Sequence, residues 1–203
     1  DAIGRGAVAV VAETPPAGAV AVPWITVGDG RLALALLADA FYGHPSRTLT
    51  VVGITGTNGK TTTAYLTSAL FEAAGVKAGL LGTVTYRIGA EEYKAERTTP
   101  EAPDLQAMMR AMVDRGCGAC ALEVSSHALA LRRVDGMAFA AAVFTNLTRD
   151  HLDYHGSMAA YFAAKRRLFD MLPAGAPAVI NLDDPQGRAL CDAVSRPVTY
   201  AIN

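Results

Sequence analysis

The decisive stretch of the chain reads Leu49-Thr50-Val51-Val52-Gly53-Ile54-Thr55-Gly56-Thr57-Asn58-Gly59-Lys60-Thr61-Thr62-Thr63. An apolar run typical of a buried strand leads into a glycine-rich turn, and a helical pattern follows. In such a turn the backbone N–H groups face phosphates, the lysine adds a positive charge, and the next hydroxyl can hold Mg²⁺. The stretch therefore predicts a protein that binds ATP or GTP.

The glycine spacing of this loop is unusual. The common G-x-x-x-x-G-K-[ST] pattern would place a glycine at position 54, which is Ile54 here, and the glycines stand at 53, 56 and 59 instead. An alternative interpretation is an ordinary strand-to-helix turn with a threonine as the helix N-cap. The flanking strand and helix are the context that a phosphate loop requires, so we expect the phosphate loop.

Composition disfavours several classes of protein. The chain has 203 residues, of which 51% are hydrophobic and 18% charged, enough to bury the core of one large or two small domains. A net charge of −1 disfavours a nucleic-acid-binding surface, and no apolar run reaches the ~18 residues of a membrane span. We expect no nucleic-acid partner, no membrane span and a monomeric protein.

Two of the three cysteines form the run Cys117-Gly118-Ala119-Cys120. A zinc site would need a second such pair, or histidines at ligand spacing, close by in the sequence. We therefore interpret both as core cysteines. The small number of cysteines and the lack of a secretory leader at the start predict a reducing, cytoplasmic compartment.

Apolar strand-like runs alternate with helical patterns along the chain. The expected strands are residues 7–12, 49–54, 78–81, 119–124, 140–145 and 178–181. The expected helices are residues 32–42, 61–74, 102–115, 157–171 and 186–194. Apolar strands separated by helices predict an α/β fold with a mostly parallel, doubly wound sheet. Ligands of such a sheet bind at the carboxyl ends of its strands.

A polar break at residues 44–47 precedes the phosphate-loop strand. We place a domain boundary at Ser46, so that residues 1–46 are the remnant of a small α/β domain and residues 47–203 form the nucleotide-binding domain. The chain opens within an apolar segment, residues 6–12, whose pattern indicates a buried strand, and closes on another, residues 198–203. Both ends predict a piece of a larger protein.

Polar side chains follow the expected strands at their carboxyl ends. Glu123 closes a buried strand, where a carboxylate is costly unless it is paired or binds a metal. It can reach a Mg²⁺ held by Thr61 if its strand neighbours the phosphate-loop strand, whereas the alternative is a carboxylate turned to solvent. His151 lies between Asp150 and Asp153 in a loop after another strand, and it is a second candidate ligand.

Other polar positions allow two interpretations. The pattern around His127 indicates an ordinary hydrogen-bonded residue, and that around His155 a surface turn. Arg133 suits a carboxylate or phosphate partner, or else is a solvated cation at a helix end. Thr98 and Thr99 can contact a substrate or simply cap the following helix.

Four motifs occur in order at residues 55–62 (TGTNGKTT), 97–101 (RTTPE), 123–127 (EVSSH) and 146–156 (NLTRDHLDYHG). Together they resemble the Mur ligases of peptidoglycan synthesis, and most closely the MurE type, which adds the third amino acid of the peptide. The resemblance extends over nearly the whole chain. It implies a P-loop central domain of this family, with ATP and Mg²⁺ as cofactors.

The resemblance also implies the residues of the site. The nucleotide-binding positions are Gly56, Thr57, Asn58, Gly59, Lys60, Thr61 and Thr62. Lys60 would contact the transferring phosphate, and Thr61, Glu123 and His151 match positions that bind Mg²⁺. Lys60, Lys165 and His151 are the expected catalytic residues.

The remaining roles concern the substrate and a modified lysine. The positions that match substrate contacts are Thr98, Thr99, Ser125 and Arg133. The implied substrate is UDP-N-acetylmuramoyl-L-alanyl-D-glutamate, joined to a diamino acid, commonly meso-2,6-diaminopimelate. Lys165 matches a lysine that the family carbamylates to N6-carboxylysine, although its own pattern indicates a surface helix cation.

The family mechanism implies that ATP converts the substrate's terminal carboxylate to an acyl phosphate, which the incoming amine then attacks. The family has a third, C-terminal domain that binds and selects the amino acid, and we expect that domain to be absent from this chain. We therefore expect the 203-residue chain alone to be inactive. Two alternatives stay open: a related ligase, such as a folylpolyglutamate-type enzyme, and a nucleotide-binding module without ligase chemistry.

Overall fold

The computed structural model describes residues 1–202, and Asn203, the last residue of the expected C-terminal segment, lies outside them. Its main feature is an eight-stranded sheet in the order β10-β9-β8-β3-β7-β4-β5-β6. The strands are β3 (Thr50–Thr55), β4 (Ala78–Leu81), β5 (Thr85–Ile88), β6 (Glu91–Lys94), β7 (Ala119–Glu123), β8 (Ala141–Phe144), β9 (Ala178–Asn181) and β10 (Pro197–Tyr200). All pairs from β10 to β4 are parallel, and β5 and β6 add an antiparallel hairpin. The predicted α/β, mostly parallel sheet is confirmed.

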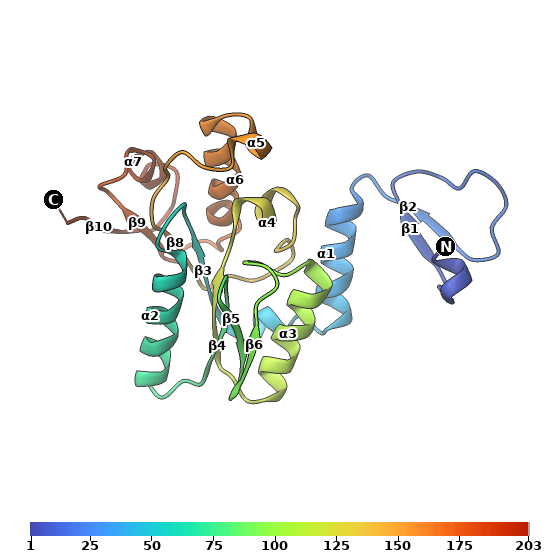
Figure 1. Cartoon of the computed structure of the whole chain (residues 1–203), viewed down its shortest axis with the longest axis horizontal. Coiled ribbons are helices and arrows are strands. Elements are labelled where there is room, and N and C mark those ends of the chain that lie inside the picture. Colours follow the sequence, from blue (N-terminus) through green and yellow to red (C-terminus); the bar gives the residue numbers. More distant parts are fainter. Residues whose placement is uncertain (203) are drawn as a thin grey trace.

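Helices lie on both faces of the sheet (Figure 1). They are α1 (Gly30–Phe41), α2 (Lys60–Ala73), α3 (Ala102–Asp114), α4 (Ser126–Ala130), α5 (Leu152–His155), α6 (Met158–Asp170) and α7 (Pro185–Cys191), with 3-10 turns η1 (Ile3–Arg5) and η2 (Pro45–Arg47). The long helices match the predicted ones to within about one turn. No helix among residues 1–202 combines the length and apolar character needed to cross a membrane.

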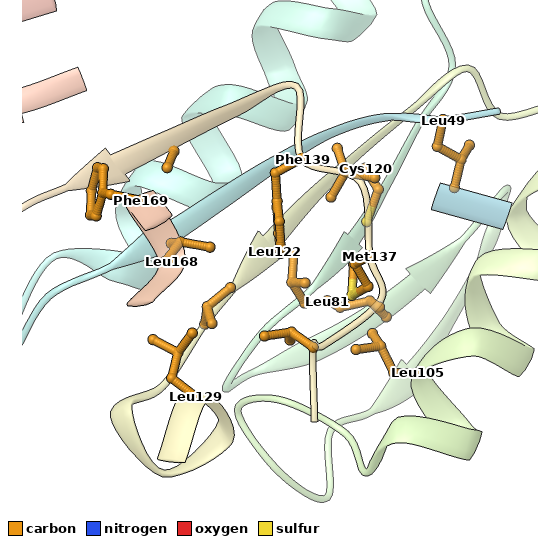
Figure 2. Packing of buried hydrophobic residues seen from close by; sticks show 14 of the residues in the cluster. Leu49, Leu81, Leu105, Cys120, Leu122, Leu129, Met137, Phe139, Leu168 and Phe169 are labelled. Atoms are coloured by element: carbon orange, nitrogen blue, oxygen red, sulfur yellow. The ribbon is translucent and has the colours of Figure 1, made fainter. Parts of the chain in front are cut away.

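Alternate residues of the central strands feed two separate cores, because successive side chains of a strand point to opposite faces. On one face Ile54, Leu80 and Ala121 pack with Ala64 of α2. On the other face lies a larger cluster, which Figure 2 shows around Leu122, Phe139 and Leu168. Cys117 and Cys120 belong to this larger cluster as free, buried thiols, so their interpretation as core cysteines is confirmed.

The N-terminal segment differs from the prediction. Residues 7–12 contain only the short strand β1 (Val10–Ala12), which pairs with β2 (Trp24–Thr26) in a separate two-stranded sheet. Figure 1 shows this pair set apart from the main sheet, beyond α1. The prediction of a buried strand here is wrong, since Val8 is 85% exposed and a lone pair of short strands buries little.

Helix α1 packs against α3 and so joins the N-terminal segment to the main body. The polar break after α1 forms η2, where the buried Ser46 hydroxyl accepts a hydrogen bond from the Ala138 N–H at 3.0 Å. The division of the chain at Ser46 stays a prediction.

Candidate nucleotide site

The loop at residues 56–59 joins the end of β3 to the start of α2. The strand–turn–helix context that the sequence predicted is therefore confirmed. β3 lies between β7 and β8, so the carboxyl ends of three parallel strands meet beside the loop. This is the edge where open α/β sheets bind their ligands. The first N–H groups of α2, a helix of 14 residues, are also directed toward this edge.

Gly56 is required by the close approach of the loop to the end of β8. Its φ is +149°, and a Cβ there would lie 1.8 Å from Thr145 Oγ1 and 3.1 Å from the backbone N and O of Asn146. Thr145 Oγ1 donates to the Asn58 carbonyl at 2.7 Å. The Asn146 side chain both accepts from Asn58 N at 3.0 Å and donates to Asn58 O at 3.1 Å. The loop is thus held in shape by β8, a role of Asn146 that the sequence did not reveal.

The Lys60 ammonium folds back over the loop. Its Nζ donates to the carbonyls of Gly56 at 2.9 Å and Thr57 at 2.7 Å. Burial lowers the pKa of Lys60, whereas the charges of Glu123 and Asp150 act to raise it. A phosphate at the loop would offer charged oxygens in place of two neutral carbonyls, which makes stronger hydrogen bonds.

Lys165 is buried beneath the same loop and is only 1% exposed. Its Nζ donates to Gly56 O at 2.7 Å and lies 4.6 Å from the centre of the Tyr161 ring. Burial, and then the charge of Lys60, lower the pKa of Lys165 to about 7. The interpretation of Lys165 as a surface cation, which the helix pattern indicated, is therefore wrong. Tyr161 and Leu168, one turn away on either side, share its buried stripe and were a signal for it.

Glu123 is fully buried at the end of β7, and its neighbour across the sheet is Ile54 of β3. Its two carboxylate oxygens accept hydrogen bonds from Thr83, one from the backbone N–H and one from the hydroxyl, both at 3.0 Å. A Cβ on Gly82 would lie 2.2 Å from Glu123 Oε1, so Gly82 leaves room for this carboxylate. The alternative of a carboxylate turned to solvent is wrong, and Thr83 is a partner that the sequence did not predict.

The expected Mg²⁺ ligands fit a shared site only in part. Thr61 lies in the first turn of α2, and Glu123 ends β7, the strand beside β3, so both supply hard oxygen donors at the loop edge. His151 precedes α5 and its side chain is 46% exposed, with Nε2 3.4 Å from Asp150 Oδ2. Among residues 1–202 no three His, Cys, Asp or Glu side chains gather as a protein-only metal site requires. A Mg²⁺ here would take phosphate and water oxygens as well.

The predicted substrate residues form a hydrogen-bonded chain next to Glu123. Thr99 Oγ1 donates to Glu123 O at 2.8 Å and accepts from Ser125 N at 3.1 Å. Thr98 Oγ1 lies 3.1 Å from Thr83 Oγ1. The N-cap alternative for the two threonines is wrong, because the N-cap position of α3 is Glu101.

Arg133 is 9% exposed, so the interpretation as a solvated cation is wrong. Its Nη2 lies 2.6 Å from Glu101 Oε1, and its Nη1 donates to Thr99 O at 3.1 Å. An arginine was expected to have a carboxylate or phosphate partner, and in this structure the partner of Arg133 is the carboxylate of Glu101.

Three of the four histidines, His127, His151 and His155, gather with Tyr154 into an aromatic cluster. The ring centre of His127 lies 4.8 Å from that of His151, 4.2 Å from that of Tyr154 and 5.5 Å from that of His155. His155 is half-buried, and its Nε2 lies 2.9 Å from Ser126 Oγ, so the surface-turn interpretation is wrong. Burial, and then the neighbouring ring of His151, lower the pKa of His127. The interpretation of His127 as an ordinary hydrogen-bonded residue did not anticipate this cluster.

Comparison with known proteins places this site in a family. Residues 54–203 match the model of the Mur ligase middle domain. The chain is 52% identical over 206 residues to the UDP-N-acetylmuramoyl-L-alanyl-D-glutamate--2,6-diaminopimelate ligase of Geobacter metallireducens, covering 98% of this chain and 40% of that protein. It is 47% identical to the UDP-N-acetylmuramyl-tripeptide synthetase of Roseiflexus sp., covering 100% of this chain and 43% of that one. The chain thus spans about 40% of the length of these relatives.

Solved structures agree with the sequence matches. A structure of a UDP-N-acetylmuramoyl-L-alanyl-D-glutamate--2,6-diaminopimelate ligase superposes with a TM-score of 0.86 at 32% identity, covering all of this chain and 42% of that one. The folylpolyglutamate synthase of Mycobacterium tuberculosis, solved with ADP and AMPPCP, superposes with a TM-score of 0.61 at 18% identity over 84% of this chain. The second likeness shows the shared fold alone.

Proposed function

This chain belongs to the Mur ligase family, and from that premise we propose that it forms the ATP-binding core of a ligase that adds a diamino acid to UDP-N-acetylmuramoyl-L-alanyl-D-glutamate. The proposed amino acid is meso-2,6-diaminopimelate, which the name of the Geobacter metallireducens relative contains. One observation carries the proposal: the phosphate loop, the buried Glu123 and the buried Lys165 meet at one edge of the sheet. The chain spans about 40% of that relative's length, so the activity is proposed for the complete enzyme.

The proposed reaction has two steps. A carboxylate oxygen of the substrate attacks the terminal phosphorus of ATP, and ADP leaves to give an acyl phosphate. The amine nitrogen then attacks the acyl carbon, the C–O bond breaks with its electron pair going to the departing phosphate, and the nitrogen loses one proton. Both steps depend chiefly on positioning and on neutralising charge.

The chain's own residues supply that positioning. Residues 56–62 hold the phosphates of ATP, with the Lys60 ammonium moving from two loop carbonyls to the transferring phosphate. Thr98, Thr99, Ser125 and Arg133 hold the muramoyl dipeptide beside Glu123. In support, Thr99 and Ser125 are already fixed to each other at 3.1 Å.

Thr61, Glu123 and His151 are the proposed holders of Mg²⁺, which would neutralise phosphate charge when bound. Both oxygens of Glu123 accept from Thr83, so this carboxylate is held in place before any ion arrives.

We also propose that Lys165 is carbamylated. Carbamylation requires a neutral amine, whose nitrogen attacks the carbon of CO₂ and then loses one proton. The burial that lowers the pKa of Lys165 to about 7 leaves a large neutral fraction near pH 7. The resulting anion would lie close to the Lys60 ammonium, since both lysines reach Gly56 O.

A substrate panel tests the proposed function in a full-length enzyme that carries this sequence. We expect phosphate release from ATP to require both UDP-N-acetylmuramoyl-L-alanyl-D-glutamate and diaminopimelate. Release driven by a folate and glutamate would indicate a folylpolyglutamate-type ligase instead. ATP hydrolysis at the same rate with and without any amino acid or sugar nucleotide would indicate a nucleotide-binding module without ligase chemistry.

A further inference from the structure

Three arginines surround the carboxylate of Glu101. Arg133 Nη2 lies 2.6 Å from Glu101 Oε1, and Arg97 Nη1 lies 3.9 Å from the same oxygen. Arg31 Nη1 lies 4.0 Å from the other oxygen, Oε2. The three arginines come from segments far apart in the sequence, namely α1, the segment before α3 and the segment after α4. One negative charge therefore faces three positive ones.

The innermost arginine still has an unused donor. Arg133 is 9% exposed, and its Nε is buried without a hydrogen-bond partner among residues 1–202. A buried N–H that lacks a partner costs free energy, and a planar guanidinium suits bidentate binding of a carboxylate or phosphate. The side chains of Arg31 and Arg97 are 54% and 58% exposed, so a ligand can reach them from solvent.

A cavity of about 720 Å³ opens beside Glu101 and Arg97. It lies between the β5–β6 hairpin and α3, and its lining includes Arg97 and Glu101 at one end and Tyr86 and Met108 in the wall. Elsewhere the ionisable lining is mostly acidic, with Glu92, Glu96 and Asp104 against the single cation Lys94. An anionic group of a ligand is therefore favoured at the end of the cavity where Arg97 lies.

The Glu101 side chain is not needed to cap α3. It occupies the N-cap position of α3, but its side chain makes no capping hydrogen bond within the described part of the chain. Its carboxylate is about one-third exposed and can turn toward solvent without costing the helix a cap.

We propose that Arg31, Arg97 and Arg133 form an anion-binding site that Glu101 fills in the free protein, and that a carboxylate or phosphate group of a ligand displaces Glu101. In this site Arg31 and Arg97 bind the anion together with Arg133. The Glu101 carboxylate competes with that anion from within the chain. That the natural anion is carried by the muramoyl dipeptide rests on the proposed function, whereas the site does not.

Titration of this chain with glutarate tests the site, because a dicarboxylate lacks the phosphate that the nucleotide loop binds. Binding is followed by NMR of the arginine Nε–Hε signals. We expect Glu101→Gln to bind glutarate about three- to tenfold more tightly than wild type, because the internal competitor is neutralised. Arg31→Gln and Arg97→Gln, both at exposed positions, should weaken binding by a similar factor.

Two matched variants control for general charge effects. Glu92→Gln removes the same charge from the same cavity away from the arginines, and Arg110→Gln removes an arginine that pairs with Asp114. Both should bind glutarate as wild type does. Unchanged or weaker binding by Glu101→Gln, or equal tightening by Glu92→Gln, would overturn the proposal. A full-length enzyme that binds glutarate as expected but ignores the muramoyl dipeptide would contradict the proposed function and leave the site standing.

Discussion

The side chains of Lys60 and Lys165 donate to the same carbonyl oxygen, that of Gly56, at 2.9 and 2.7 Å. Two ammonium groups so close repel each other, and Lys165 is the more deeply buried of the two. Its lowered pKa relieves this repulsion by favouring the neutral amine. The nucleotide loop and helix α6 are therefore coupled through one backbone oxygen.

Replacing Lys60 should change the chemistry of Lys165. Lys60→Met removes a positive charge that lowers the pKa of Lys165, so that pKa should rise and the neutral fraction at pH 7 should fall. A carbamate would also lose its nearest cation. We expect less Lys165 carbamate at pH 7, measured by ¹³C NMR of the chain equilibrated with ¹³C-bicarbonate.

The matched control is Lys77→Met, which removes an exposed lysine that donates to Arg115 O. It should leave the carbamate signal unchanged. An equal or stronger signal in Lys60→Met would show that the two lysines are not coupled as described.

Lys165 should make stability depend on pH in a defined direction. Its pKa is about 7 in the folded chain and about 10.5 when unfolded, so between these values the unfolded chain holds a proton that the folded chain lacks. The free energy of unfolding should therefore rise with pH from about 7 to 10.5, by up to about 1.4 kcal/mol per pH unit. Below pH 7 both states are protonated and this dependence ends.

Urea unfolding of wild type and Lys165→Met across pH 6 to 10.5 measures this term as a difference. We expect Lys165→Met to have the flatter profile and the wild type to gain on it as pH rises. Parallel profiles would mean that Lys165 keeps an ordinary pKa in the folded chain.

Gly56→Ala should disrupt the phosphate loop. The new methyl group would meet Thr145 Oγ1 at 1.8 Å, at a φ of +149° that disfavours alanine. We expect a loss of more than about 2 kcal/mol of stability, together with loss of ADP binding measured by calorimetry.

Gly75→Ala provides the comparison. Gly75 also has a positive φ, +78°, but a Cβ there meets no atom within 4 Å among the described residues. It should cost about 1 kcal/mol and leave ADP binding intact. If both variants bind ADP equally well, the close approach of Gly56 to Thr145 does not shape the loop.

Glu123→Gln tests the proposed Mg²⁺ ligand without emptying the space around it. The amide still fills the space beside Gly82 and within reach of the Thr83 hydroxyl, but it lacks the negative charge that Mg²⁺ prefers. We expect ADP affinity to lose most of its dependence on Mg²⁺, while the melting temperature stays close to that of wild type. Glu92→Gln, an exposed position on β6, should keep the full dependence. A variant Glu123→Gln with the wild-type response would exclude Glu123 as a ligand.

The sequence predicts the parts of the fold that have regular apolar patterns. The strands at residues 78–81 and 178–181 have the predicted bounds, because both are short apolar runs with a clear limit: the first is followed by Gly82 and the second closes on Asn181. The hairpin strand β6 was not predicted, since its four residues are all exposed and three of them are charged. Short edge strands of this kind lack the alternation that identifies strands.

The sequence singles out residues of the candidate site, but not their burial or their partners. The glycines and the lysine of the phosphate loop are recognisable in the sequence. The burial of Lys165, in contrast, depends on how α6 packs beneath that loop. Thr83 belongs to no motif, and the motif that contains Glu101 does not reveal its partner; only the folded chain shows that Thr83 holds Glu123 and that Glu101 pairs with Arg133. Contacts between distant segments are set by packing, which one sequence does not display.

Tripeptide formation by the Lys60→Ala variant of a full-length enzyme that carries this sequence tests the central claim most directly. Lys60 is the cation at the mouth of the loop, so its loss should abolish ATP-dependent addition of diaminopimelate to the muramoyl dipeptide. The far-ultraviolet circular dichroism and the melting temperature should show an intact fold. Near-normal tripeptide formation by this variant would contradict the assignment of the loop as the ATP site.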